Sequence, residues 1–404
     1  MIDPGKAPAA ENSGFKLKLV LLLSSTMTIM SGATISPSLP GMRSVFADTR
    51  LVDVLVPLVL TAPALSIAIT SFFVGYLADR FGRKPVLGFA LLLYGVSGTS
   101  GLYLSSLGSI IAGRVVLGVA VAGIMTCTNA LIADYYSGIA RAKFMGVQNS
   151  FVALGGVLFL VMGGVLADAH WRAPFVIYSL SLLLLPAALY ILHEPVHKGP
   201  AVPGSSAPLR VAPWGLLSVI YLMAFSAQII FYAIPVKLPF LVEEIAGPSA
   251  TLAGVAIATS TFCAAISSLF HSRVRQFLSY QGVYAMQALL FCAGYLMLAY
   301  SDSYAEVMAA MAVCGTGFGQ FMPNTAIWLA ELAPEEMRGR LFGLLTMSLF
   351  LGQFVSPFFT QPVNSLNGLR GPFGVYGSGA IMGGVVAMIF LVWAIKIHRS
   401  KKSN

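Results

Sequence analysis

The sequence has few charges. Asp, Glu, Lys and Arg make up 10% of its 404 residues, and hydrophobic residues make up 57%. Soluble globular proteins are about 25% charged, so a soluble fold of this length could not cover its surface with so few. Lipid is therefore the expected solvent. Because lipid offers the backbone no hydrogen-bond partners, only helices or closed barrels can span it. The apolar runs are long and continuous, whereas a barrel would show short alternating segments, so we expect helices.

The sequence also lacks the clusters of His, Cys and acidic residues that metal and catalytic sites require. Its four cysteines lie in apolar stretches with no CxxC spacing: Cys127, Cys263, Cys292 and Cys314. We therefore predict no metal, no cofactor and no enzyme activity. A non-transporting membrane sensor would carry a sizeable soluble domain, and no stretch of the chain offers one. Transport is the class of function that the composition favours.

Basic residues outnumber acidic ones, which gives a net charge of +9. They are scattered over many short segments, so we expect no nucleic-acid binding and instead the usual excess of Lys and Arg in cytoplasmic loops. Residues 1–16 predict a polar leader. The apolar run that follows has no clear signal-peptidase site and continues into Pro37 and Pro40. It predicts a first transmembrane helix and not a cleaved signal.

Apolar runs of about 20 residues, long enough to cross a bilayer, recur along the chain. They predict twelve spans, at residues 17–40, 53–77, 85–105, 108–133, 144–167, 173–192, 213–236, 250–270, 279–299, 304–330, 341–363 and 373–396. A linker rich in Pro, Gly and Ser, at 193–212, divides a first six-helix bundle at 17–192 from a second at 213–396. Residues 397–404 form a basic tail.

Lys and Arg are distributed unequally between the two sides of these spans. With the N-terminus inside, only five fall outside: Arg43, Arg50, Arg172, Lys237 and Arg370. We therefore expect both termini in the cytoplasm. The compact loops and short termini are typical of a bacterial inner-membrane protein, and we expect a monomer. The final Lys401-Lys402 matches a dilysine retrieval signal of eukaryotic endomembranes, but the compact loops favour an ordinary basic tail.

The two bundles resemble each other at one constant offset. Four pairs correspond: Asp134 with Glu331, Arg141 with Arg338, Gly118 with Gly315, and Gly155 with Gly352. Matching charged and glycine positions indicate an internal repeat. In transporters such repeats place the substrate site at their interface, near the middle of the membrane.

The segment between the second and third spans reads Gly75-Tyr-Leu-Ala-Asp79-Arg80-Phe-Gly82-Arg83-Lys84-Pro85. It resembles the signature loop of the major facilitator superfamily, at the position where that family carries it. The resemblance implies twelve helices in two pseudo-symmetric bundles around a central site that opens alternately to either side. In physical terms, Gly82 permits a tight turn and Gly75 a close approach of two helices.

The resemblance also implies a conformational lock. Asp79 would contact the start of the eleventh span and hold the outward-facing state, and Arg83 would pair with Asp134. Arg141 would be a further partner. The equivalent segment of the second half, around His271, has lost both the aspartate and the glycine. We therefore expect the lock in the first half.

Two features bear on the branch of the family. Arg114, followed by Gly118 and Gly123, resembles a fourth-span motif of drug-efflux branches. A buried charge in a membrane is costly and tends to be functional, whereas an arginine near the interface would extend its head group to water. The fifth span departs from the antiporter pattern, because Phe159-Leu160 stands where that pattern has Gly-Pro.

The family's cavity-lining spans, the first, fourth, seventh and tenth, carry polar groups here. Substrate-binding or coupling candidates from these spans and their neighbours are Arg114, Asn129, Gln148, Gln228, Tyr232, Lys237, Gln320, Asn324, Trp328 and Gln353. No span has an acidic residue near its midpoint, so the acidic candidates lie near span ends: Asp53, Glu306 and Glu331. A polar and basic set favours a neutral or anionic amphipathic substrate over a simple cation.

We therefore expect a secondary active transporter that exports a small amphipathic compound, with proton coupling left open. The alternative is an uptake permease for an organic anion or a metal-chelating metabolite, because the same loop motif would serve it. The expected partners are the small-molecule substrate and the lipid bilayer.

Overall fold

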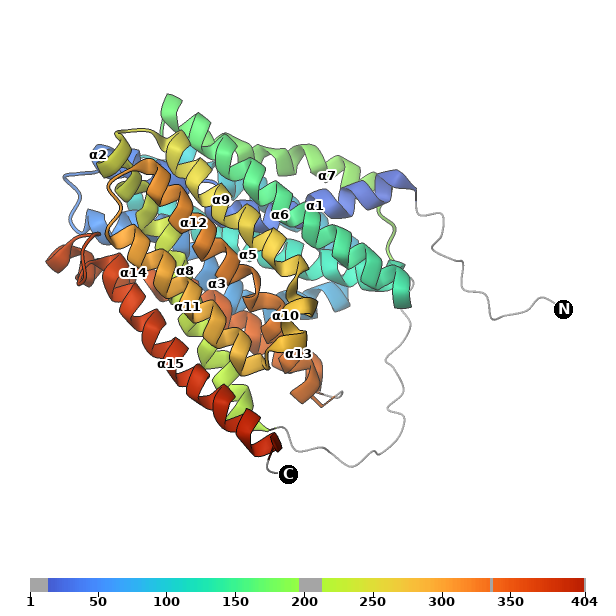
Figure 1. Cartoon of the computed structure of the whole chain (residues 1–404). Helices are drawn as coiled ribbons and strands as arrows, with labels where there is room; N and C mark the ends of the chain where they lie inside the picture. Colours follow the sequence, from blue (N-terminus) through green and yellow to red (C-terminus); the bar gives the residue numbers. More distant parts are fainter. Residues whose placement is uncertain (1–13, 196–212, 335–336, 403–404) are drawn as a thin grey trace.

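The computed structural model describes residues 14–195, 213–334 and 337–402, which form helices and turns without a strand. Most of the predicted linker lies outside them. The first half comprises α1 (Phe15–Ala33), η2 (Ser36–Ser38), α2 (Leu39–Val45), α3 (Val52–Phe81), α4 (Arg83–Gly98), η3 (Thr99–Leu102), α5 (Leu107–Tyr135), α6 (Gly138–Ala169), η4 (Ala173–Ser179) and α7 (Leu180–Ile191). The second comprises α8 (Trp214–Ala246), α9 (Ala250–Leu269), α10 (His271–Phe277), α11 (Tyr280–Ala299), α12 (Tyr304–Gly319), α13 (Phe321–Leu332), α14 (Arg338–Asn367) and α15 (Val375–Lys402). Figure 1 shows the long helices running side by side, which confirms the predicted all-helical class.

Eleven helical segments of the described chain are long and apolar enough to cross a membrane. The predicted tenth span is absent from that set because it is divided into α12 and α13. Pro323 has no N–H, and its ring would clash with the carbonyl group of Gly319, where α12 ends. With the divided pair counted as one crossing, the twelve crossings expected from the sequence are all present.

The first span is broken by proline in the same way. Pro37 and Pro40 follow the end of α1 by four and seven residues, and the chain passes through η2 before α2. The span therefore continues to Val45, beyond its predicted end at residue 40.

The seventh span is longer than the sequence pattern predicts. The sequence pattern ends it at residue 236 and leaves Lys237 in an outer loop, but α8 continues to Ala246 and buries that lysine. Pro235 and Pro239 remove two N–H donors from the helix. Side chains of other spans bond to carbonyl groups nearby: Ser356 to that of Ile229, Tyr295 to that of Ile230, and Ser36 to that of Pro235. Pro239 frees the carbonyl group of Pro235, four residues earlier, and the bond from Ser36 gives that group a partner, so the helix tolerates this proline.

Both halves repeat the same close helix contacts. A Cβ on Gly118 of α5 would overlap the carbonyl oxygen of Pro63 on α3, and a Cβ on Gly315 of α12 would overlap that of Ser260 on α9. Pro63 and Ser260 are separated by the same offset as Gly118 and Gly315. The fourth and second spans of each half therefore pack through equivalent positions, as the sequence repeat indicates.

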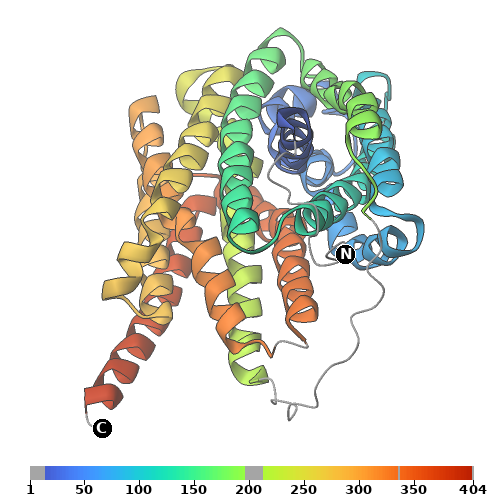
Figure 2. The same ribbon diagram turned by 90° about the vertical axis from the view of Figure 1, so that its right-hand side faces the viewer.

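The bundle has two ends, named here by their residues. The motif end carries the turn at residues 82–84, the start of α6 and the end of α15. The Asp168 end carries the end of α6 and the starts of α9 and α12. Figure 2 looks onto the motif end and shows the halves as two groups of helices, α1–α7 and α8–α15.

Candidate functional site

The signature loop forms a tight turn between α3 and α4 at the motif end. Gly82 adopts a φ of +95°, a conformation that favours glycine, and α4 begins at the next residue. Arg83 forms an ion pair with Asp134 at the end of α5, and its guanidinium lies 3.8 Å from the carboxylate of Asp79. The structure therefore brings together three of the residues expected in the lock.

Glu194 is part of this turn, and the sequence reasoning missed it. Its carboxylate accepts hydrogen bonds from the backbone N–H groups of Arg83 at 2.7 Å and Lys84 at 2.8 Å. These are the free donors at the start of α4, where an anion is favourable. The hydroxyl of Tyr135 bonds to the backbone of the adjacent His193. The segment after α7 is thereby attached to the loop.

Other expected members of the lock lie apart from it. A Cβ on Gly75 would meet no atom within 4 Å, so the close approach expected there does not occur in this conformation. Arg80 lies over the ring of Phe81. Arg141 is exposed, and its side chain has no hydrogen-bond or ion-pair partner among the described residues.

The second half carries a weakened copy of the ion pair. In the internal repeat, Tyr280 at the start of α11 corresponds to Arg83 of the first half, and Glu331 corresponds to Asp134. The Tyr280 hydroxyl donates to the carboxylate of Glu331. A neutral hydroxyl thus replaces the guanidinium, and Glu331 is held at the motif end.

Arg114 is 0% exposed and lies inside the first half. Its guanidinium donates to the carbonyl oxygens of Val59 (3.1 Å) and Ser31, and to the hydroxyl of Tyr178 at 3.1 Å. The ring of Tyr178 lies 5.0 Å away and that of Phe175 5.9 Å away. The alternative of a head group extended to water is wrong. Arg114 instead joins the first, second, fourth and sixth spans.

Three polar side chains of the first half meet near the motif end. Gln148 of α6 donates from its amide nitrogen to Ser25 of α1 at 2.9 Å and to Asn129 of α5 at 3.1 Å. Gln148 is buried and Asn129 is exposed. The cluster is neutral and offers hydrogen-bonding groups to a ligand.

Three candidates of the tenth span lie within the second half, packed against α9, α10 and α11. Asn324 donates to the carbonyl oxygen of Tyr280, and Trp328 stacks on the Tyr280 ring at 5.6 Å. Gln320 bonds to Ser267 and His271. The tenth span was expected to line the cavity because of its polar groups and the family resemblance, but these three residues fill contacts between helices of the second half.

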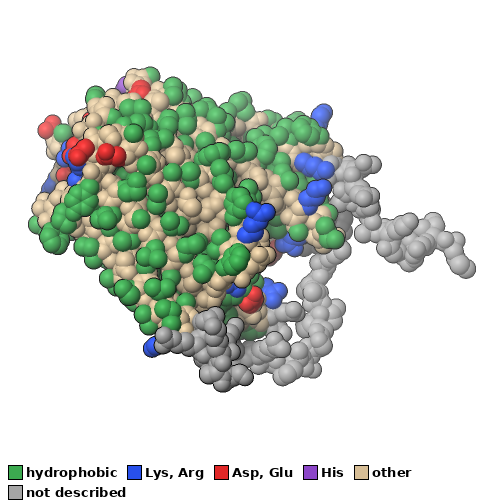
Figure 3. Space-filling view, viewed as in Figure 1, with side chains coloured by type: hydrophobic (Ala, Val, Ile, Leu, Met, Phe, Trp, Pro, Cys, Tyr) green, Lys and Arg blue, Asp and Glu red, His purple; other side chains and the backbone are tan. Residues whose placement is uncertain are grey.

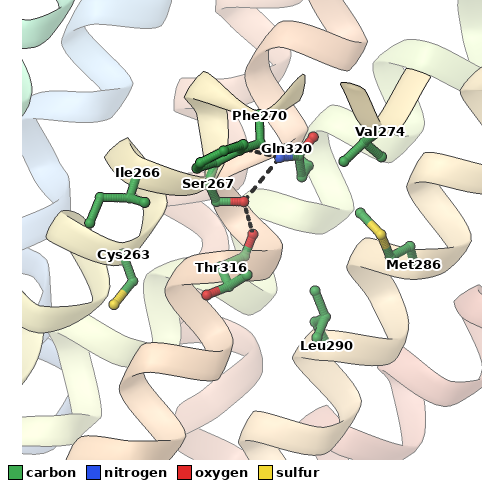
Figure 4. Close-up of a pocket in the computed structure, with 9 residues that line it drawn as sticks. All are labelled: Cys263, Ile266, Ser267, Phe270, Val274, Met286, Leu290, Thr316 and Gln320. Carbon is green, nitrogen blue, oxygen red and sulfur yellow. Dashed lines mark hydrogen bonds between the residues drawn. The ribbon is translucent and has the colours of Figure 1, made fainter. Parts of the chain in front are cut away.

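Gln320 and Ser267 border a cavity of about 360 Å³ between α9, α10, α11 and α12. Figure 4 shows the two side chains hydrogen-bonded to each other, with apolar side chains from three helices around them. The remaining lining residues are Cys263, Ile266, Phe270, Val274, Met286, Leu290 and Thr316. All belong to the second half, so this cavity is separate from the interface between the halves.

Two of the three candidates on α8, Tyr232 and Lys237, lie along that interface. Gln228 is buried, and its side-chain oxygen has no hydrogen-bond partner among the described residues. The hydroxyl of Tyr232 lies where a Cβ on Gly32 of α1 would stand, so α8 and α1 approach closely there. Lys237 is 3% exposed and donates to the side-chain oxygen of Gln361 on α14 at 2.5 Å. Gln353 of α14 is partly buried.

The remaining acidic candidates have structural partners. Asp53 forms an ion pair with Arg43 at 2.6 Å. Glu306 caps α12 in a reciprocal arrangement with Ser303. Both lie at the Asp168 end, away from the middle of any span. Within the described chain the membrane interior therefore carries two basic residues, Arg114 and Lys237, and no acidic side chain near a span midpoint.

Contacts between the halves close the Asp168 end. Asp168 of α6 accepts hydrogen bonds from the backbone N–H groups of Ala250 at 2.6 Å and Thr251 at 3.1 Å, and from the Thr251 hydroxyl. A Cβ on Gly164 of α6 or on Gly254 of α9 would overlap the backbone of the other helix. No sequence pattern pointed to Asp168, because its partners belong to the other half.

The motif end is open. The contact of α6 with α9 reaches from Gly164 to Gly156, which lies against Thr261. Beyond it, Ile139 on α6 is 89% exposed and Leu269 on α9 is 75% exposed. Figure 3 shows the surface hollowed at this end between the halves. The halves therefore touch at one end and separate at the other.

Comparisons with known proteins agree with this architecture. The family model for the Major Facilitator Superfamily matches residues 21–245 and 220–404. Quinolone resistance protein NorA of Staphylococcus aureus (strain MSSA476) is 24% identical over 355 residues, which cover 85% of this chain and 88% of that protein. Tetracycline resistance protein, class C, of Escherichia coli is 26% identical over 372 residues, covering 85% and 89%. The bacillibactin exporter of Bacillus subtilis (strain 168) is 30% identical over 168 residues, covering 39% and 41%.

Solved structures share the fold at low sequence identity. A bacterial homolog of the human lysosomal transporter Spinster, in an inward-facing conformation, matches with a TM-score of 0.72, 19% identity and 96% coverage of each chain. A D-xylose-proton symporter matches with a TM-score of 0.72 and 18% identity, covering 93% of this chain and 97% of that chain.

Proposed function

Since the chain belongs to the major facilitator superfamily of membrane transporters, we propose that it exports a small amphipathic compound, neutral or anionic, by alternating access. The observation that carries this proposal is the asymmetry of the interface: closed at the Asp168 end by Asp168 and the contacts of α6 with α9, and open at the motif end. If two rigid halves with such an interface rock against each other, the motif end closes and the Asp168 end opens.

Charge at the two ends supports export towards the Asp168 side. Lys and Arg at the motif end include Arg80, Arg83, Lys84, Arg273 and Arg275. By the positive-inside rule that end faces the cytoplasm, in a bacterial inner membrane, and the protein acts as a monomer in this proposal. The structure then represents the state that loads substrate from the cytoplasm. The named relatives NorA and the tetracycline resistance protein support the outward direction.

The chemistry of the interior supports the substrate class. The polar groups without a charge include amides and a phenol: Asn129 and Gln148 in the first half, Gln228 in the second, and Tyr232 where α8 meets α1. Phe231 adds an aromatic face, stacked on Phe318 at 3.6 Å between ring centroids. Because the interior carries the permanent charge of Arg114 and no mid-span carboxylate, a simple organic cation would be repelled without compensation.

The test is transport in proteoliposomes with an imposed pH gradient. Tetracycline and the quinolone norfloxacin serve as probes, and ethidium serves as a permanent cation. We expect a lumen more acidic than the outside to drive accumulation of tetracycline or norfloxacin and not of ethidium. Accumulation of ethidium alone, or of none of the probes with or without the gradient, would contradict the proposal.

An uptake permease for an organic anion or a metal-chelating metabolite is the second candidate. The fold likeness to a D-xylose-proton symporter supports it, because the same architecture serves transport driven in the other direction. Expression in cells separates the two candidates. An exporter lowers the steady-state cellular content of the transported probe, and an uptake permease raises it.

A further inference from the structure

Lys237 is a buried basic residue with one neutral partner. Its side chain is 3% exposed, and its side-chain nitrogen donates to Gln361. Among the described residues no carboxylate lies within ion-pairing distance of it. An ammonium group held in a dry interior by a single amide is costly, whereas a neutral amine can be buried with such a partner.

The acidic groups around Lys237 are already engaged with other partners or lie far along their helices. From the helices packed on α8 come Arg43 on α2, Glu306 on α12, Glu331 on α13, and Arg338 and Arg340 on α14, and α3, which packs on α2 and α14, adds Asp53. On α8 itself Glu243 and Glu244 follow near its end, and η2 and α9 carry no charged residue. Asp53 is paired with Arg43, Glu306 caps α12, and Glu244 lies 3.8 Å from Arg370. Glu331, Arg338 and Arg340 lie at the motif end, at the far end of their helices.

The lysine lies where the two halves meet. The preceding Val236 packs in the core of the first half, and Leu238 packs in that of the second. Ser36 of the first half donates to the carbonyl oxygen of Pro235. Separation of the halves at the Asp168 end would therefore bring water to Lys237, and closure removes it.

Of the two interior basic residues, only lysine can exchange a proton. Arg114 keeps its charge in proteins, while a lysine amine releases its proton readily when buried. The conformational change thus moves an exchangeable group between water and a dry site.

We propose that Lys237 is the coupling residue: it takes a proton from water when the Asp168 end is open and gives it up through the open motif end, so that a neutral amine bonds to Gln361 in the conformation described here. The ammonium becomes a neutral amine, and its proton passes to water on the motif side. This proposal rests on the proposed function, because it supplies the proton exchange that would drive export.

The first test needs no substrate. Spin labels at Ile139 and Leu269, in the full chain with its four cysteines replaced by alanine, report the opening of the motif end in lipid nanodiscs. Electron–electron distances are measured from about pH 5.5 to about pH 9, a range in which a perturbed lysine titrates. With one linked proton, the ratio of long to short distances should rise with pH by up to about tenfold per unit.

Two substitutions should separate the charge states. Lys237→Gln, which mimics the neutral amine, should favour the long distance by a ratio that does not change with pH. Lys237→Arg, which stays charged, should give the short distance at every pH. Lys237→Met is a second neutral variant, should the arginine variant fail to fold. Lys396→Gln, the same change at an exposed site on α15, should titrate like the parent. A Lys237→Gln protein that still titrates like the parent would overturn the proposal.

A second measurement separates this proposal from the proposed function. In proteoliposomes, Lys237→Gln should exchange tetracycline across the membrane but lose accumulation driven by a pH gradient. If the parent protein moves none of the probes, the proposed function fails, while the distance measurement still decides the role of Lys237. Gradient-driven accumulation by Lys237→Gln at the parent level would overturn the role of the lysine alone.

Discussion

Replacing Asp168 by asparagine should shift the protein away from the conformation described here. The carboxylate of Asp168 accepts three hydrogen bonds from the first residues of α9, across the interface between the halves. The side-chain amide of the Asp168→Asn variant would keep one acceptor oxygen and lose the charge that the start of a helix favours. The contact exists only while the Asp168 end is closed, so its loss acts on one state alone.

The magnitude follows from the contacts. A hydrogen bond to a charged group contributes about 1.5–3 kcal/mol when buried, but Asp168 is exposed, and solvent reduces the gain. We take a loss of about 1–2 kcal/mol, which corresponds to a roughly 5–30-fold change in the ratio of the two states. Spin labels at Ile139 and Leu269 measure that ratio directly.

The matched control is Asp48→Asn. Asp48 is exposed at the same end, between α2 and α3, and has no hydrogen-bond or ion-pair partner among the described residues. It should leave the distance distribution unchanged. If Asp168→Asn and Asp48→Asn give the same distribution as the parent, the contact does not stabilise the closed end, and the reasoning from it fails.

Three further predictions concern the scaffold. Gly315→Val should destabilise the protein by about 1–3 kcal/mol or more, because the added carbons overlap the backbone at Ser260. Its thermal unfolding midpoint should be lower than that of Gly146→Val, because the site of Gly146 is open. Glu194→Gln should weaken the cap of α4 by about 1 kcal/mol, so hydrogen exchange at the amides of Arg83 and Lys84 should become faster. Glu243→Gln is the control. Unchanged exchange in Glu194→Gln would contradict the capping role. Arg114→Lys should lower the unfolding midpoint more than Arg141→Lys, because an ammonium group cannot make the forked contacts with three groups; equal midpoints would contradict the joining role.

The parts of the fold that depend on local sequence could be predicted. Long apolar runs predict spans, and Gly82 predicts the turn because few other residues adopt its φ. The pairing of Arg83 with Asp134 followed from the family motif and is present. Gly118 and Gly315 were matched by the repeat, and their contacts proved equivalent.

What could not be predicted depends on partners far away in the chain. Asp168 reads as an ordinary polar residue at a helix end, and only the start of α9 gives it a role. Glu194 follows the sixth span but caps the third. Lys237 sits between two prolines that suggested the end of a helix, and the side chains that bond to the carbonyl groups beside them come from three other spans. Gln320 turns into the second half because Pro323 breaks the helix beside it.

In the proposed mechanism, transport requires the Asp168 end to open and close. Cysteines at positions 168 and 251, replacing Asp168 and Thr251 whose side chains meet across the interface, would hold that end closed when oxidised. The chain with its four native cysteines replaced provides the background, and the reduced protein is its own control. We predict that oxidation stops accumulation of tetracycline or norfloxacin in proteoliposomes and that reductant restores it. Undiminished accumulation by the fully cross-linked protein would contradict alternating access through this end.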